Sequence, residues 1–406
     1  MAEKSGPLKG LTVIEFAHVM AGPVCGLMLA DMGADVIKIE KVPGGDDTRR
    51  MGPPDIGDTA AAFMMMNRNK RGIALDLKSA GGRDVARRLL QTADVTIENY
   101  RQGTMEKLGL GYDALAADNP GLVYCEISGF GRTGPYAGRG GFDLVAQGMS
   151  GLMSVTGEGP GRAPVKVGPP VSDITAGILG AMGILAALQE RSRTGRGQRV
   201  DTSLFEAAIT HTYWQSAIAM ATGTPPVPMG SAHPMSAPYQ AFETAEGWLV
   251  LGAANQNTWL RLMEVIAVPA IAEDSRFADN AARMANLDAL VEALNAVFRQ
   301  GSRDDWLTRL EAAGVPAGPV NDIAEMHADP QVLARGMVVE PEHHRLGPVA
   351  TIGLPVKFSN SPGAVAFGAP DYGQHTREVL AEYGYDAAAI DELVSAGAVV
   401  AADPTD

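Results

Sequence analysis

The chain has 406 residues, more than one hydrophobic core usually serves, so we expect two domains. Its composition, 46% hydrophobic and 20% charged, is that of a globular protein. The net charge of −14 argues against nonspecific binding of nucleic acids, because such binding needs a basic surface.

The first elements of the chain predict a βαβ unit. The opening residues, MAEKSGPLKG, lack the apolar core of a signal peptide. Residues 11–16 (LTVIEF) predict a buried strand, a helix begins near Pro23 with Gly33 at its end, and residues 34–40 (ADVIKIE) predict a second strand. Such a unit predicts a parallel sheet with helices on both faces. The alternation continues through GIALDL, GGRDVARRLLQTA, DVTIENY and GLVYCEIS.

An uncharged helix with a single acid in front of it follows. Residues 174–188 carry apolar side chains at helical spacing, and glycines recur there at 177, 180 and 183. Because glycine is a poor helix former, this repeat indicates close packing on another backbone. The stretch is shorter than the roughly 20 residues that span a bilayer. Asp173, directly before it, is either a helix cap or a carboxylate held at a site.

The remaining segments suggest a linker and a second group of elements. Residues 221–239 are rich in proline, glycine and small polar residues, which is typical of a linker or an irregular wall. A strand (GWLVLGAA), several helices to about Gly314, then ATIGLPVKF and the helix-like GQHTREVLAEYG follow. Cys25 and Cys125 lie in apolar contexts, which indicates buried thiols. We expect a soluble, cytoplasmic protein without membrane or nucleic-acid partners.

Several enzyme classes lack their signatures in this chain. The turn after the first strand reads AHVMAGPV, without the GxGxxG of a dinucleotide dehydrogenase, and no P-loop motif occurs. Neither HExxH nor a histidine pair at zinc spacing is present, so no metal site is predicted. His343 and His344, in polar surroundings, are expected to be solvated. No serine stands in a GxSxG elbow.

A series of motifs runs along nearly the whole chain. It begins with LKGLTVIEFAHVMAGPVCGLMLADMGADVIKIEKVPGGDDTR and ISGFGRTGPYAGRGGFDLVAQGMSG. It continues through SDITAGILGAMGILAAL and TGRGQRVDTSLFEA to GVPAGPVNDIAEMHADPQVLARGMV and GQHTREVL. With these motifs the chain resembles the family III CoA-transferases, typified by formyl-CoA transferase and the carnitine and bile-acid CoA-transferases. The order of these motifs along the chain makes the resemblance specific.

The resemblance implies an α/β fold in an interlocked homodimer. A Rossmann-like large domain with a parallel sheet binds CoA and is built from residues 1–220 and 331–406. A smaller inserted α+β domain with its linkers then occupies residues 221–330. No tightly bound cofactor is expected, since coenzyme A enters as the acyl-CoA substrate, together with small carboxylic acids.

The resemblance assigns Asp173 as the catalytic nucleophile. Its carboxylate attacks the thioester of an acyl-CoA, forming a mixed anhydride and releasing CoA thiolate. The thiolate then attacks the aspartyl carbonyl, which frees the donor acid and leaves an aspartyl-CoA thioester. The acceptor acid reverses these steps with its own carboxylate, so the thioester energy is conserved. Water must be excluded, because the anhydride would hydrolyse.

The CoA site implied by the resemblance lies in loops that follow the predicted strands, where open α/β sheets bind ligands. Its residues are His18, Val19, Met20, Ala21, Lys41, Leu75, Asp76, Lys78, Asn99, Tyr100, Arg101, Lys107, Arg139, Gly140 and Phe142. Formyl-CoA transferase has arginine at the positions of Lys41 and Lys107, and lysine loses the bidentate fork. Asp143, His233 and Tyr239 are predicted on the substrate side.

An α-methylacyl-CoA racemase of the same superfamily is the alternative. Racemases carry GHD where this chain has GFD, and Phe142 cannot act as a general base. The transferase is therefore favoured, with succinyl-CoA as donor and a short-chain carboxylic or dicarboxylic acid as acceptor.

Overall fold

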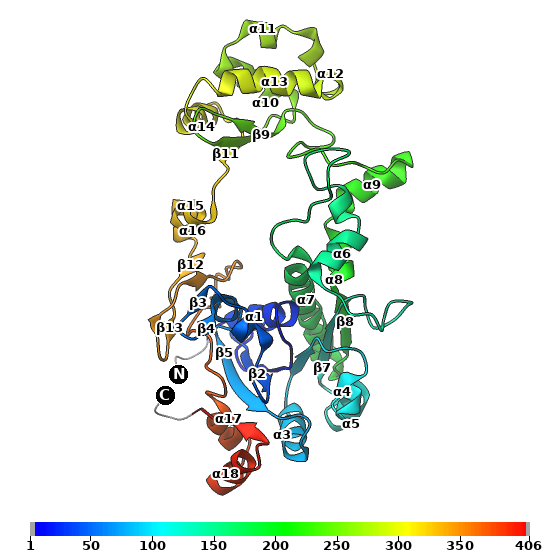
Figure 1. Ribbon diagram of the computed structural model, residues 1–406, viewed down its shortest axis with the longest axis vertical. Coiled ribbons are helices and arrows are strands. Elements are labelled where there is room, and N and C mark those ends of the chain that lie inside the picture. Colours follow the sequence, from blue (N-terminus) through cyan, green and yellow to red (C-terminus); the bar gives the residue numbers. More distant parts are fainter. Residues whose placement is uncertain (1–4, 403–406) are drawn as a thin grey trace. The chain divides into compact units, whose positions relative to one another are not determined.

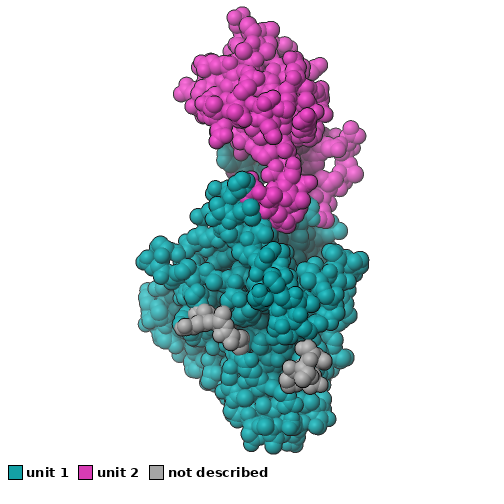
Figure 2. All heavy atoms as spheres, turned by 90° about the vertical axis from the view of Figure 1, so that its left-hand side faces the viewer, with its two compact units in different colours: residues 1–152, 167–216, 330–406 teal, residues 153–166, 217–329 magenta. Residues whose placement is uncertain are grey.

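The computed structural model describes residues 5–402, which form two compact units (Figure 2). The large unit contains the residues up to Leu152, Val167–Ser216 and the residues from Pro330 onwards. The small unit contains Met153–Lys166 and Ala217–Asp329. The sequence-based division kept residues 153–166 in the large part, although the segment MSVTGEGPGRAPVK is rich in glycine and proline.

The large unit is built on a seven-stranded sheet in the order β16-β5-β2-β1-β6-β7-β8 (Figure 1). All neighbours run parallel except β16, which is antiparallel to β5. The α/β class with a parallel central sheet is thereby confirmed. The strands are β1 (Thr12–Glu15), β2 (Asp35–Lys41), β5 (Lys70–Leu75), β6 (Val95–Glu98), β7 (Val123–Ser128), β8 (Arg199–Ser203) and β16 (Val399–Val400).

Helices cover both faces of this sheet. Successive strand residues point to opposite sides, so each buried strand contributes side chains to a core on either face. Val13 belongs to the core on one face and Ile14 to the core on the other. The first core contains residues of α1 (Ala21–Asp31), α6 (Asp143–Met149), α7 (Val171–Thr194) and α8 (Leu204–Thr210). The second contains residues of α3 (Ala80–Leu90), α4 (Thr104–Lys107), α5 (Tyr112–Asp118), α17 (Thr376–Glu382) and α18 (Ala387–Ser395).

The glycines of α7 let it approach its neighbours closely. A Cβ on Gly177 would lie 2.6 Å from the carbonyl oxygen of Ala21 in α1. One on Gly180 would lie 3.2 Å from the sulfur of Cys25 and 3.4 Å from that of Cys125, both of which are buried free thiols. Among the described residues, α7 alone is long and apolar enough to cross a membrane. These glycine contacts mark it instead as a core helix that extends beyond the uncharged stretch.

Short elements complete the large unit. They are α2 (Ala61–Met66), α16 (Pro330–Ala334) and the two-stranded pairs β3–β4 (Asp55–Ile56 and Thr59–Ala60), β12–β15 (Val338–Val339 and Thr351–Ile352) and β13–β14 (Glu342–His343 and Gly347–Pro348). Helix α9 (Tyr213–Thr222) spans the boundary between the units.

The small unit combines a three-stranded antiparallel sheet with helices. Its sheet has the order β11-β10-β9, made of Ala317–Pro319, Trp248–Gly252 and Tyr239–Glu243. Phe242, Leu249 and Leu251 of this sheet share a core with Trp259 and Phe298 of the helices. The helices are α10 (Gln256–Ile266), α11 (Pro269–Ala272), α12 (Asn280–Ala285), α13 (Leu287–Phe298), α14 (Arg303–Ala312) and α15 (Ile323–Ala328).

Candidate active site

A cavity of about 470 Å³ lies in the large unit at the carboxyl ends of the parallel strands. The loops that follow β1, β2, β6 and β7 line it, as expected for a ligand site in an open α/β sheet. The structure brings together these residues from the set predicted by resemblance: His18, Val19, Met20, Ala21, Lys41, Asn99, Tyr100, Arg101, Arg139, Gly140, Phe142 and Asp173.

Four residues predicted to bind CoA do not line this cavity. Leu75 is the last residue of β5, and its fully buried side chain belongs to the hydrophobic core. Lys78 is exposed, and its backbone N–H donates to Asp76 Oδ1 at 3.0 Å, so both residues belong to the turn beyond the strand. Lys107 is exposed at the end of α4.

Sequence reasoning missed part of the cavity wall. The residues are Asp47, Gln102, Ile127, Ser128, Gly129, Arg132, Ala137, Gly138 and Leu204, whereas Gly141 lies within the range 139–142 that the resemblance implied. The glycine-rich stretch after β7 was the available signal: a Cβ on Gly141 would lie 2.5 Å from the Cα of Gly129, so the ends of that loop meet backbone to backbone. Arg132 is ion-paired to Glu98 at 2.5 Å and to Glu126 at 3.2 Å.

Asp173 lies in the first turn of α7 and lines the cavity. Burial, and to a smaller extent the negative charge of Asp143, raises the pKa of the Asp173 carboxyl to about 7. Asp173 is not the helix cap, because the N-cap position is Pro170 and no side chain of that residue caps the helix. The carboxylate is therefore available to the cavity rather than occupied in capping.

Asp143 has a structural task at this site. Its Oδ1 accepts the backbone N–H of Ser172 at 2.9 Å, and its Oδ2 accepts Gln147 Nε2 at 2.7 Å. Gln147 Oε1 in turn accepts the N–H of Val167 at 2.9 Å. Asp143 thus binds one of the unpaired amides at the start of α7, next to Asp173. Asp143 itself does not line the cavity, and its predicted place on the substrate side stays a prediction.

The loop after β1 is tied to the loop after β6. The N–H of His18 donates to Asn99 Oδ1 at 2.9 Å, and Asn99 Nδ2 donates back to the carbonyl of His18 at 2.8 Å. The His18 Nε2 atom lies 2.8 Å from the hydroxyl of Tyr100. Burial and the nearby charge of Lys38 lower the pKa of His18 to about 4, so its imidazole is neutral at neutral pH.

Lys41 and Arg139 are cationic side chains that line the cavity, and each contacts a neighbouring side chain. Lys41 Nζ lies 2.7 Å from Asp47 Oδ1, and both side chains are about half exposed. Arg139 lies over the ring of Tyr136, with the guanidinium carbon 4.6 Å from the ring centroid. Both cations are exposed to solvent and so are available to anionic groups of a ligand.

His233 and Tyr239 belong to the small unit, where their ring centroids are 5.2 Å apart. Their predicted contact with the acid substrate stays a prediction.

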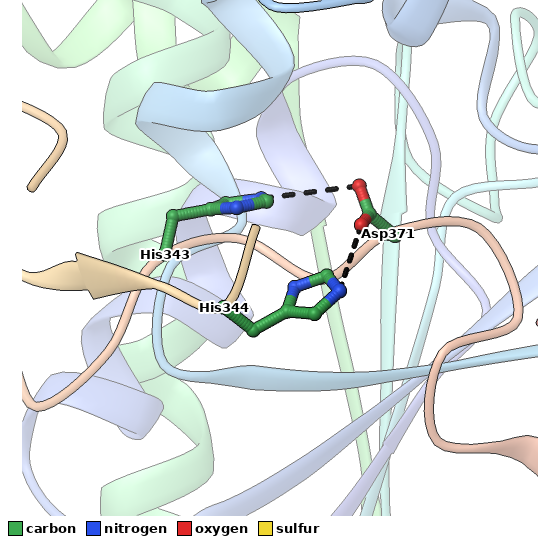
Figure 3. A group of neighbouring side chains, drawn as sticks. All are labelled: His343, His344 and Asp371. Carbon is green, nitrogen blue, oxygen red and sulfur yellow. Dashed lines mark ion pairs between the residues drawn. The ribbon is translucent and has the colours of Figure 1, made fainter. Parts of the chain in front are cut away.

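His343, His344 and Asp371 form the one cluster among the described residues with the spacing of metal ligands (Figure 3). The expectation that both histidines are solvated is wrong for His343. This residue is 2% exposed and packs closely against Gly368. Arg345 contacts both oxygens of Asp371, at 2.8 and 3.0 Å, and its N–H donates to His343 Nδ1. Asp371 thus has a cationic partner in Arg345, beside the two histidines.

These features define an α/β enzyme with its ligand site at the sheet's carboxyl edge and a partly buried carboxylate beside it. The chain belongs to CoA-transferase family III, whose model matches residues 8–376. It is similar to the succinate–glutarate CoA-transferase of Agrobacterium fabrum, with 43% identity over 94% of this chain and 97% of the relative. The human succinyl-CoA:glutarate CoA-transferase is 36% identical over 97% of this chain and 90% of its own length.

The fold agrees with these relatives. A CAIB/BAIF family protein from Brucella suis superimposes with a TM-score of 0.85 and 42% identity, covering 94% of this chain and 100% of the other. The predicted family is confirmed, and the protein is a CoA-transferase whose substrates are CoA thioesters and carboxylic acids, with relatives that support transfer to dicarboxylates.

Proposed function

We propose that the enzyme transfers CoA from succinyl-CoA to a short-chain dicarboxylic acid, with Asp173 as the nucleophile. The observation that carries the proposal is the Asp173 carboxylate in the wall of the cavity at the strand ends, beside the loops at His18 and Arg139. The names of the relatives support the donor and the class of acceptor.

The proposed chemistry begins with Asp173 in its ionised form. One carboxylate oxygen attacks the thioester carbonyl of succinyl-CoA, the C–S bond breaks, and CoA leaves as the thiolate. The thiolate attacks the aspartyl carbonyl of the anhydride, which releases succinate and leaves aspartyl-CoA. The acceptor carboxylate attacks this thioester and expels the thiolate, which then attacks the acceptor carbonyl of the new anhydride and regenerates Asp173.

Local structure suits each part of this cycle. The start of α7 places Asp173 where the helix dipole favours negative charge, and partial burial limits the access of water to the anhydride. Phe142 is 77% exposed and lines the same cavity, at the position where a racemase has its histidine. The phenyl side chain of Phe142 has no proton that it could exchange with a substrate. This observation favours transfer over racemisation.

The mechanism is tested by trapping the intermediate. The enzyme is incubated with succinyl-CoA without acceptor, digested, and analysed by mass spectrometry for a CoA thioester on the Asp173 peptide. We expect the adduct in the unmodified enzyme and its loss, together with transferase activity, in Asp173→Ala. Full activity of Asp173→Ala without an adduct would exclude the mechanism.

The substrates are tested separately. Succinyl-CoA and other acyl-CoA donors are combined with glutarate, malate, mesaconate, citramalate, itaconate and oxalate, and with carnitine and a bile acid for comparison. The products are separated by liquid chromatography. We expect the dicarboxylates to react from succinyl-CoA. Activity with carnitine or a bile acid alone would contradict the dicarboxylate assignment and leave the class of enzyme intact.

We further propose that two chains form the interlocked homodimer that the family resemblance implies, with the small domain inserted into the large one. One face of α7 supports an interface, because Ile178, Met182 and Leu185 lie four and three residues apart and are 48%, 60% and 36% exposed. Tyr213 and Trp214 add further exposed aromatic surface, at 72% and 56%. Sedimentation should give a dimer, and Met182→Glu should weaken it. A monomeric unmodified protein would refute the proposal.

A further inference from the structure

The loop after β1 adopts a backbone conformation that its sequence does not favour. Val19 has a φ of 67°, in the left-handed region that β-branched residues rarely enter. Val19 is also 38% exposed and lines the cavity with His18 and Met20. Strained residues of this kind persist only where surrounding contacts over-determine them, and they gather at functional sites.

A buried carboxylate holds the strained residue. The N–H of Val19 donates to Asp46, at 3.1 Å from Oδ1 and 3.3 Å from Oδ2. Asp46 is 0% exposed, and Lys38 Nζ lies 2.9 Å from its Oδ2. Burial alone would raise the pKa of Asp46, but the charge of Lys38, together with His18 and the hydrogen bonds from Lys38 and Thr48, holds the pKa well below its usual range. Asp46 is thus an ionised acceptor for the strained amide of Val19.

Lys38 contacts the same loop from its other side. Its ammonium donates to the carbonyl of Ala17 at 2.9 Å, and it pairs with the equally buried Glu15 at 3.1 Å. The Lys38–Asp46 pair therefore contacts the main chain on both sides of His18, at Ala17 and at Val19. The hydroxyl and the N–H of Thr48 also donate to Asp46 Oδ1, at 2.8 and 3.0 Å.

We propose that Asp46 is a positioning residue for the acyl-CoA site: together with Lys38 it clamps the main chain around His18 and so fixes Val19 and Met20 in the cavity wall. Asp46 does not line the cavity and contacts its wall through the amide of Val19. The inference rests on the proposed function, in which this cavity takes the acyl-CoA that Asp173 attacks.

A merely structural role predicts a different set of effects. Loss of a buried ion pair lowers the melting temperature wherever the pair lies, but it leaves ligand affinity unchanged in the molecules that remain folded. Asp31 offers a matched control, since it is buried and pairs with Arg68 at 2.6 Å and with Asn69 at 2.7 Å. It lies at the far end of α1, ten residues after Ala21 and so roughly 15 Å away along the helix.

The test compares Asp46→Asn with Asp31→Asn, well below their melting temperatures. Loss of a charge-assisted hydrogen bond should raise the KM and the Kd for succinyl-CoA about tenfold or more in Asp46→Asn, with a smaller change in kcat. Asp31→Asn should lower the melting temperature and leave that KM within about twofold. An unchanged KM and Kd in folded Asp46→Asn overturns the proposal. Thioester trapping on Asp173 in the same sample keeps the two hypotheses apart, because it reports the nucleophile and not the clamp.

A measurement on the unmodified enzyme keeps the proposal testable if Asp46→Asn does not fold. Hydrogen exchange resolved to single amides should show slow exchange at Val19, because its N–H is bonded to a buried carboxylate. Exchange of the Val19 amide as fast as in an open loop shows that Asp46 does not hold it, and overturns the clamp.

Discussion

Replacing Asp173, the proposed nucleophile, by its neutral isostere should stabilise the fold while abolishing catalysis. In Asp173→Asn the side chain keeps its size but can no longer ionise. The pKa of Asp173 is raised from 3.8 to about 7, so the folded protein holds this proton more tightly than the unfolded chain. Ionisation therefore costs stability progressively as the pH rises from about 4 to about 7, and the full penalty applies above pH 7.

The size of this effect follows from the pKa shift. A shift of about three units corresponds to at most about 4 kcal/mol, at about 1.4 kcal/mol per unit. Because Asp173 is only partly shielded from solvent, we expect about half of that limit, roughly 2 kcal/mol, for Asp173→Asn at pH 8. At pH 4 and below, where the carboxyl is protonated in the folded protein, the gain should vanish.

The neighbouring acid provides the matched control with the opposite sign. Asp143 accepts the amide of Ser172 and the side chain of Gln147, so Asp143→Asn weakens two charge-assisted bonds and should lose roughly 1–2 kcal/mol. Urea denaturation of both variants and the unmodified protein, followed by circular dichroism between pH 4 and 8 at one protein concentration, measures both differences. A stability difference for Asp173→Asn that does not change with pH would refute the reasoning.

Three further outcomes are expected. The rate of CoA transfer should rise with pH through a midpoint near 7, as Asp173 ionises. Asp143→Asn should move this midpoint to lower pH, because the negative charge next to Asp173 is removed. A rate that stays constant from pH 5.5 to 8.5 would contradict this prediction. Gly177→Ala should lower the free energy of unfolding in urea by about 1–3 kcal/mol, because the new Cβ would lie 2.6 Å from the carbonyl oxygen of Ala21. The control Gly168→Ala should have little effect, because its Cβ would have no neighbour within 4 Å. Equal effects of the two substitutions would contradict the close packing. Lys41→Ala should raise the KM for acyl-CoA several-fold, by loss of a cation at the cavity, and Lys41→Arg should restore it; the KM for the acceptor acid is the internal control.

The sequence predicted the sheet where strands are apolar and missed it where they are not. Runs such as TVIE and VIKIE are buried on both faces and were recognisable, but β8 reads RVDTS and pairs with β7 as an exposed edge strand. Its polar alternation gives no signal of burial, so only the partner strand reveals it.

The same limit applies to the site. The resemblance placed Asp173 and the His18 loop at one cavity, but it also named Leu75, whose side chain the strand directs into the core. The Lys38–Asp46 pair was invisible, because a lysine within a strand and an acid in a loop reveal their contact only when the tertiary fold joins them. His343 shows the converse error, since a polar sequence neighbourhood does not prevent burial.

The close approach of α7 to α1 has a consequence for how this enzyme can change. Gly177 stands one helical turn after Asp173 and touches the main chain of Ala21, which lines the cavity. The spacing between Asp173, the proposed nucleophile, and the cavity wall at Ala21 is thus set by backbone against backbone, without any intervening rotamer. Side chains elsewhere in the cavity wall can therefore be replaced to accept a different acid while this backbone spacing is kept. Selectivity for the acid substrate can then change without a change in the reaction.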